Sequence, residues 1–242
     1  MDNRSLDWTT DTLLAADARG EVTPAAVLFL LRLYAASGRD DVREAVARGL
    51  ALGLDAVAVG SDPWERCQWL GLFAEAASVS DDARLPDAIR TVTPLAIDDL
   101  EQAVRAGYEP GEGVLGAGLV DQLRAALALL TAFDLTGRLP YPMLAEELVQ
   151  VARRRAWDDA RGMFQADFGA NAVAARVLCR LTALHRDPEY TAGAIVVRQA
   201  TYREDAERTL ESLAPIHRGY PGSAADYGIA LLDCFALTAH PH

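Results

Sequence analysis

Apolar residues recur at helical spacing in almost every long segment of this chain, and sustained alternation of apolar and polar residues is nearly absent. Proline near a first turn and glycine just past a last turn, as in Pro24 and Gly38, mark typical helix boundaries. Pro94 is expected to kink one helix. The pattern predicts an all-α protein with helices over 22–38, 40–58, 62–80, 85–107, 116–137, 140–157, 171–185, 203–217 and 224–240.

The predicted helices alternate in character along the chain. Those that begin near residues 23, 62, 118, 171 and 224 are apolar on most sides, whereas segments such as 40–49 and 203–213 are rich in Arg, Glu and Asp. A helix that is apolar all round must be covered on all sides, and a one-sided amphipathic helix lies outside with its charges in water. We therefore predict an α/α toroid of helical hairpins, with an inner ring of parallel helices inside an outer antiparallel ring.

The apolar helices also recur at a regular interval. Trp64, Asp121, Asn171 and Asp226 lie in the first turn or two of successive apolar helices, about 50 to 57 residues apart, which is the length of a hairpin of two helices with its loops. Such units cannot bury their apolar faces alone and stack on their neighbours. The 242 residues are therefore predicted to form one domain, 1–242.

In a ring of parallel inner helices, all inner amino termini open at the same end, where the helix dipoles add positive potential. Polar first-turn side chains would converge there, with aromatic walls around them. Aromatic faces beside carboxylates suit sugars, whose C–H faces stack while their hydroxyls need acceptors. The candidates for this pocket are Trp64, Glu65, Asp121, Gln122, Trp157, Phe164, Asp167, Asn171, Asp226 and Tyr227.

An ordinary structural role competes with the pocket at several of these positions. Asp and Asn at helix starts are most often caps that accept hydrogen bonds from free backbone N–H groups. Capping is the favoured interpretation for Asn171 and Asp226. It explains Asp121 less well, because Asp121 lies a few residues past Gly116 and Gly118 within an otherwise apolar stripe.

Three stretches also suggest a family. "GLVDQLRAALALLTAFDLTG", "AWDDARGMF" and "ANAVAARVLCRLTALHRDPEY", the last followed by "YREDAERTLESLAP", together resemble the α/α-toroid region of spermatogenesis-associated thioredoxin-like proteins. They are similar, more distantly, to N-acylglucosamine 2-epimerases and the six-hairpin glycosidase superfamily. The resemblance runs from about residue 116 to 232, roughly half the chain, and implies a toroid with a carbohydrate-related pocket.

Particular residues match motifs of that family. A Trp-Asp…Gly-x-Phe segment follows an outer helix there and returns to the next inner helix, and Trp157, Asp158, Gly162 and Phe164 stand in those places. The Ser-Gly-Asn turn of the family becomes Gly-Ala-Asn at 169–171. The thioredoxin-like domain is absent, and the chain is short for six hairpins, so the ring is expected to be incomplete, five-membered or completed by a partner. Residues 191–201 carry no helical pattern and are interpreted as an insertion.

Two classes of function follow. In the first, the pocket binds or modifies a sugar or similar polyol, with Asp121 and Asp226 as a catalytic pair for glycoside hydrolysis. In the second, the chain is a non-catalytic helical scaffold that binds a protein partner. Epimerase chemistry is excluded because the four histidines, His185, His217, His240 and His242, lie outside the inner first turns.

Net charge and cysteine content limit the ligands and cofactors that we expect for this protein. The formal net charge of −12 argues against nucleic-acid binding, and all 23 basic residues are arginines. The three cysteines lie far apart with no Cys-x-x-Cys, so we expect neither a redox pair nor a zinc site but small buried hydrophobes in a reducing cytosol. No metal motif and no cofactor motif is apparent.

The most apolar stretch, "PAAVLFLLRLYAA", is too short to span a bilayer, and the first ten residues form no signal sequence. We expect a soluble, cytoplasmic protein that binds no membrane.

Overall fold

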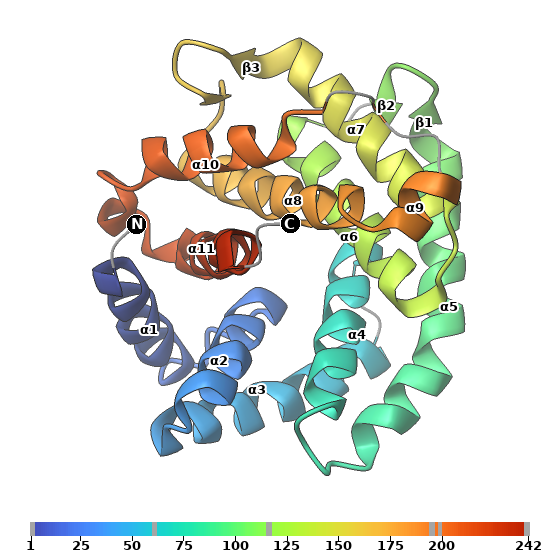
Figure 1. The fold of residues 1–242 in the computed structure, drawn as a ribbon. Helices are drawn as coiled ribbons and strands as arrows, with labels where there is room; N and C mark the ends of the chain where they lie inside the picture. The colour runs from blue at the N-terminus through green and yellow to red at the C-terminus, as the bar shows by residue number, and fades with distance from the viewer. Residues whose placement is uncertain (1–2, 60–61, 115–117, 194–196, 198–199, 240–242) are drawn as a thin grey trace.

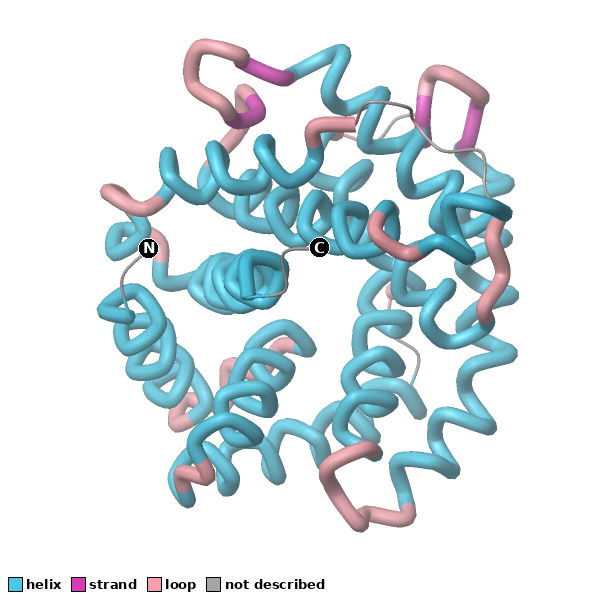
Figure 2. The backbone as a smooth tube through the Cα atoms, in the orientation of Figure 1, coloured by secondary structure: helices cyan, strands magenta, loops and turns pink. Residues whose placement is uncertain are grey.

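The structure, a computed structural model, describes residues 3–59, 62–114, 118–193, 197 and 200–239 (Figure 1). In these residues the chain forms eleven α-helices and two hairpins of very short strands, so the all-α prediction is confirmed (Figures 1 and 2). The helices are α1 (Asn3–Asp17), α2 (Pro24–Ser37), α3 (Asp40–Val59), α4 (Pro63–Ala77), α5 (Arg84–Gly107), α6 (Leu119–Thr136), α7 (Pro140–Ala156), α8 (Phe168–His185), α9 (Pro188–Gly193), α10 (Tyr202–Leu213) and α11 (Ala224–Ala239).

Five helices contact one another in a cyclic order. The helix α2 packs on α4, α4 on α6, α6 on α8, α8 on α11, and α11 again on α2. We call these five the inner helices and their cyclic order the ring. Each of α3, α5, α7 and α10 packs on the inner helix that comes directly before or after it in the chain, and these helices lie at the periphery in Figure 1. The five inner helices are the ones whose sequences are apolar on most sides, as expected for helices that are covered from several directions.

The first helix, α1, was not predicted from the sequence. It packs on α11, α2 and α3, at the junction between the last and the first inner helix. Its buried positions include Thr9 and Thr10, whose hydroxyls donate to the carbonyl oxygens of Ser5 and Leu6 at 2.9 and 2.8 Å. Because the helix backbone accepts these hydroxyl protons, polar residues can occupy the buried face of α1. They interrupt the helical spacing of apolar residues, so the helix is hard to recognise in the sequence.

Two β-hairpins connect outer helices to the inner helices that follow. After α5, β1 (Tyr108–Glu109) pairs antiparallel with β2 (Gly113–Val114), and after α7, β3 (Trp157–Asp158) pairs with β4 (Met163–Phe164). Gly113 and Gly162 adopt φ values of 84° and 66°, in the left-handed region that favours glycine. The second hairpin contains Trp157, Asp158, Gly162 and Phe164, and it connects α7 to α8.

Several predicted boundaries change. The helix α5 continues through Pro94 as one element, and the helix predicted over 203–217 ends at Leu213. The first residues of the 191–201 segment belong to α9, while 194–196, 198 and 199 lie outside the described residues. In the described ranges, no helix is both long and apolar enough to cross a membrane.

Candidate functional site

The amino-terminal ends of the inner helices meet at one cavity. It has a volume of about 390 Å³ and receives first-turn residues from α2, α4 and α11 and second-turn residues from α6 and α8. We call it the mouth cavity. Its described lining residues are Thr23, Pro24, Ala25, Asp62, Trp64, Glu65, Gln68, Arg124, Leu127, Val173, Gly222, Ala225 and Asp226. Of the ten predicted pocket residues, Trp64, Glu65 and Asp226 therefore lie at this cavity.

The α4 side of the mouth cavity is ordered by local hydrogen bonds. Asp62 caps α4, its carboxylate accepting the backbone N–H of Glu65 at 3.3 Å. The Glu65 carboxylate in turn accepts the indole N–H of Trp69 at 3.3 Å, and Trp69 is 2% exposed. A buried tryptophan thus holds the Glu65 carboxylate on the cavity wall next to the half-buried Trp64.

The α11 side of the mouth cavity carries a charge pair. Asp226 accepts a hydrogen bond from Nη1 of Arg176 on α8, and the two side chains are 27% and 6% exposed. Among the described residues, the buried Nε of Arg176 has no hydrogen-bond partner. On the α6 side, Arg124 is exposed. Within the described ranges, no carboxylate lies within ion-pair distance of its guanidinium. The mouth cavity therefore offers hydrogen-bond acceptors from α4 and α11 and a donor from α6.

A second cavity continues from the mouth into the middle of the ring. It has a volume of about 120 Å³, shares Pro24, Ala25 and Gln68 with the mouth cavity, and is lined by residues of all five inner helices. We call it the central cavity. Its charged lining residues are Arg32, Glu75, Asp134, Arg176, Arg180 and Asp233.

These charges are paired across neighbouring helices. Arg32 on α2 contacts Glu75 on α4 at 2.7 Å and Asp233 on α11 at 2.6 Å. Burial opposes the positive charge of Arg32, but the hydrogen bonds and the attraction of the two carboxylates outweigh it and raise the pKa of Arg32. The network ties α2 to both of its neighbours in the inner ring.

A second pair joins α6 and α8 in the same cavity. Arg180 donates to the Thr131 hydroxyl at 2.9 Å and pairs with Asp134. Burial lowers the pKa of Arg180 and raises the pKa of Asp134, and in both cases the partner's opposite charge counteracts the effect of burial. The central cavity is thus lined by paired charges as well as by apolar side chains such as Leu28, Leu72 and Ile229.

The interpretation of Asp121 is corrected by the structure. Its carboxylate accepts the backbone N–H of Gly118 at 3.2 Å, as a cap of α6, and Asp121 is not among the residues that line the mouth cavity. Capping therefore explains Asp121 well, contrary to the expectation, and Asp121 and Asp226 do not share one cavity. Gln122 does not line the mouth cavity either. It is 3% exposed, and its side-chain amide packs against Gly113, where an added Cβ would lie 2.7 Å from the amide oxygen.

Asn171 is neither a cap nor part of the mouth cavity. The helix α8 begins at Phe168, and its cap is Asp167, whose carboxylate accepts the N–H of Ala170 at 2.8 Å. Asn171 is 0% exposed, accepts the Phe164 N–H at 2.9 Å, and donates to the carbonyl oxygens of Phe164, Ala166 and Asp167 at 3.1, 3.3 and 2.9 Å. Its amide fastens β4 and the turn to the start of α8.

The remaining aromatic candidates pack away from the mouth cavity. Trp157 meets Phe164 edge to face, with 5.1 Å between ring centroids, and Phe164 is 1% exposed. Tyr227 is 1% exposed and stacks on His217 at 5.3 Å. None of the three lines the mouth cavity in the part of the chain that the structure describes. Phe164 and Tyr227 are core residues, and the half-buried Trp157 packs against that core.

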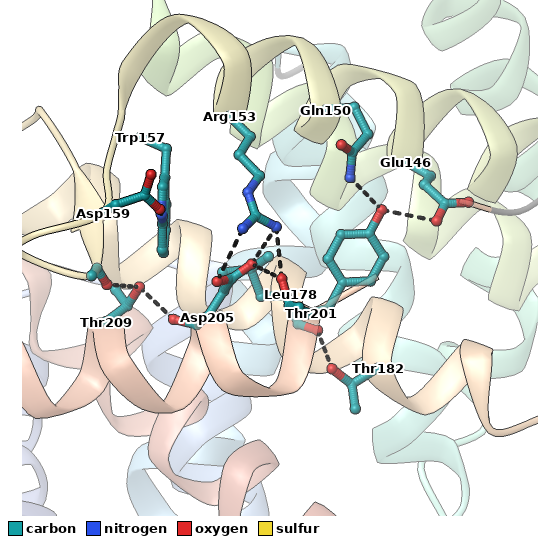
Figure 3. Close-up of polar contacts among 12 residues, drawn as sticks. Glu146, Gln150, Arg153, Trp157, Asp159, Leu178, Thr182, Thr201, Asp205 and Thr209 are labelled. Atoms are coloured by element: carbon teal, nitrogen blue, oxygen red, sulfur yellow. Dashed lines mark hydrogen bonds and ion pairs between the residues drawn. The ribbon is translucent and has the colours of Figure 1, made fainter. Parts of the chain in front are cut away.

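A further polar cluster lies between α7, α8 and α10 (Figure 3). Arg153 on α7 pairs with Asp205 on α10 at 2.6 Å and donates to Thr201 at 2.9 Å. The Tyr202 hydroxyl donates to Glu146 at 2.8 Å, and Gln150 donates to that hydroxyl at 2.8 Å. These contacts join two outer helices, and we assign them a structural role.

The residues that sequence reasoning missed are the charges inside the apolar helices. Arg32 interrupts "PAAVLFLLRLYAA", and Arg176 and Arg180 are one turn apart in "ANAVAARVLCRLTALH". A charge within an all-round apolar helix must be paired when buried, so these positions carried a usable signal.

Comparisons with known protein families, with curated proteins and with solved structures find no match to this chain. The resemblance to α/α-toroid proteins therefore stays a prediction. Within the described residues, no group of three or more His, Cys, Asp or Glu side chains is arranged to hold a metal ion.

Proposed function

We propose that the mouth cavity binds a sugar or a similar polyol. The observation that carries this proposal is the placement of Trp64 beside Glu65 and Asp226, on two different helices, around one cavity of about 390 Å³. The volume lies within the range of about 300–1,000 Å³ that small-molecule sites occupy. An aromatic face can stack on the C–H face of a sugar ring, while carboxylate oxygens accept its hydroxyl protons.

The proposal includes the architecture. A cyclic order of five inner helices, with their amino-terminal turns at one cavity, supports a five-membered α/α toroid that closes within one chain. The family resemblance supports a carbohydrate ligand for such a ring. The proposal also places the protein in the cytoplasm, because the three cysteines are free and thiols stay reduced there.

The site supports binding more directly than hydrolysis. Glycoside hydrolysis needs two carboxyl groups that face one substrate, about 5–9.5 Å apart according to stereochemical outcome. Asp121 caps α6 and does not line the mouth cavity. The two carboxylates that could act together on a substrate there are Glu65 and Asp226. We therefore propose that the mouth cavity binds its ligand, and turnover is one outcome of the experiment below.

The experiment is a thermal-shift screen against mono- and disaccharides, followed by calorimetric titration of each hit. A bound sugar at a hundredfold excess over Kd stabilises the protein by about 2.7 kcal/mol. We expect Trp64→Ala and Glu65→Gln each to weaken binding about tenfold or more, and Asp98→Asn to leave it unchanged. Asp98 is a matched control because it is an exposed carboxylate on α5, far along the chain from the mouth residues.

Two results would contradict the proposal. One is the absence of stabilisation across the panel, which would favour the non-catalytic scaffold that binds a protein partner. The other is binding that survives both Trp64→Ala and Glu65→Gln. Hydrolysis of aryl-glycosides that is lost in Glu65→Gln and in Asp226→Asn, in protein shown to be folded, would extend the function from binding to catalysis.

A further inference from the structure

Two of the three cysteines, far apart in sequence, meet between neighbouring inner helices. Cys179 on α8 and Cys234 on α11 are free, and they are 1% and 4% exposed. Each of the two thiols lies close enough to shift the pKa of the other. The Cys179 sulfur also lies 3.9 Å from the carbonyl oxygen of Ala230, one turn before Cys234. The absence of a Cys-x-x-Cys motif therefore did not exclude a pair of adjacent thiols.

The environments of the two thiols differ. Interaction with the neighbouring Cys234 thiol, together with burial, raises the pKa of Cys179. The neighbouring Cys179 thiol lowers the pKa of Cys234, against the effect of burial. The third cysteine, Cys67 on α4, has no such partner, and burial raises its pKa to about 12.

A cavity leads to this pair from outside. It has a volume of about 430 Å³, and Cys179 forms part of its wall together with Arg180, Arg186 and Leu237. Since α8 and α11 contribute their carboxyl-terminal halves to it, this cavity opens at the end of the ring opposite the mouth cavity. A small oxidant can therefore reach Cys179, beside Cys234, without passing the proposed ligand site.

We infer that Cys179 and Cys234 are a modification site, at which a peroxide converts the two thiols into a disulfide that joins α8 to α11. One of the two sulfurs, as its thiolate, attacks one peroxide oxygen, so that the O–O bond breaks, hydroxide leaves and that cysteine becomes a sulfenic acid. The sulfur of the other cysteine then attacks the sulfenic acid sulfur, and water leaves as the S–S bond forms. The two thiol protons end in water, and two thiols with one hydrogen peroxide yield one disulfide and two waters.

The cross-link would act on the inner ring. Arg180 and Asp233, which are adjacent in sequence to the two cysteines, line the central cavity, and the ion pair of Arg176 with Asp226 spans the same two helices. A covalent bond would hold this side of the ring at its native spacing. The inference does not rest on the proposed ligand, so failure of either one leaves the other testable.

The experiment treats the folded full chain with hydrogen peroxide, removes the oxidant, alkylates the remaining thiols and maps the peptides without reduction. We expect a mass lower by two hydrogens, one peptide pair joined through Cys179 and Cys234, and Cys67 alkylated as in the untreated protein. We also expect Tm to rise by about 5–10 °C and to return after reduction with a dithiol. Cys67→Ser should behave as the unmodified chain does, whereas Cys179→Ser and Cys234→Ser should each abolish the mass loss.

Several results would overturn the inference. These are an unchanged thiol count, sulfinic acid in place of a disulfide, a disulfide between two molecules, and a cross-link that includes Cys67. A disulfide that lowers Tm would also overturn it, because the bond would then form only by distorting the contact of α8 with α11. The main readout uses the unmodified chain, so it does not depend on the folding of any variant.

Discussion

Arg176 on α8 forms an ion pair with Asp226 on α11 at the place where the mouth cavity meets the central cavity. Arg176 comes from the wall of the central cavity and Asp226 from the wall of the mouth cavity. The pair therefore links two neighbouring inner helices, and it joins a buried guanidinium to a carboxylate that is partly exposed to solvent. We expect the loss of this ion pair to change both the stability of the protein and the charge of the mouth cavity.

The first prediction concerns this pair. Asp226→Asn should destabilise the protein by about 2–3 kcal/mol, because Arg176, with a side chain only 6% exposed, is left as a buried charge without a carboxylate. The double variant Arg176→Leu, Asp226→Leu should lose less, since no uncompensated charge remains. Urea denaturation followed by circular dichroism measures both. A double variant less stable than Asp226→Asn would show that the pair itself stabilises the fold.

The second prediction separates a fastening amide from a helix cap. Asn171→Ala removes all hydrogen bonds of a side chain that is 0% exposed and leaves the buried Phe164 N–H without its acceptor and the Ala166 carbonyl without this donor. We expect a loss of about 3 kcal/mol or more. Asp167→Ala removes one capping bond and should cost about 1 kcal/mol. Equal losses for the two variants, measured by denaturant titration, would mean that Asn171 acts only as a helix-starting residue.

The third prediction compares two buried tyrosines. Among the described residues the Tyr190 hydroxyl is buried with no hydrogen-bond partner, whereas the Tyr202 hydroxyl bonds to Glu146 and Gln150 at 2.8 Å each. Tyr190→Phe should therefore leave stability unchanged or raise it slightly. Tyr202→Phe should destabilise by about 1–3 kcal/mol, because the buried Glu146 loses a donor. A destabilised Tyr190→Phe variant would point to a buried water that satisfies this hydroxyl.

The fourth prediction is a loss of stability in alkali. Burial, followed by the hydrogen bond to Glu101, raises the pKa of Tyr141 to about 12. In the unfolded chain a tyrosine titrates near about 10, so the native state retains this proton longer. Stability from this group is complete below about pH 10 and is lost as the pH rises toward about 12. Denaturation midpoints across this window should fall less steeply in Tyr141→Phe, and an identical slope would contradict the prediction.

The mouth cavity shows how far local sequence could predict the site. Asp121 and Asp226 both lie at the starts of apolar helices, and both were open to the same two interpretations, cap or pocket. In the structure Asp121 caps α6 away from the mouth cavity, Asp62 caps α4 at its wall, and Asp226 pairs with Arg176. Which interpretation holds depends on the rotation of each helix about its own axis, and packing sets that rotation.

The sequence by itself predicted nine of the eleven described helices, all but α1 and α9, and their division into apolar and charged ones, because helical periodicity is a relation between residues three or four positions apart. Only the tertiary structure decided which first-turn side chains share a cavity. It alone brought Arg32 to Asp233 and Cys179 to Cys234. Those contacts join residues on different inner helices, and their geometry follows from how the helices pack around the ring, which no local pattern encodes.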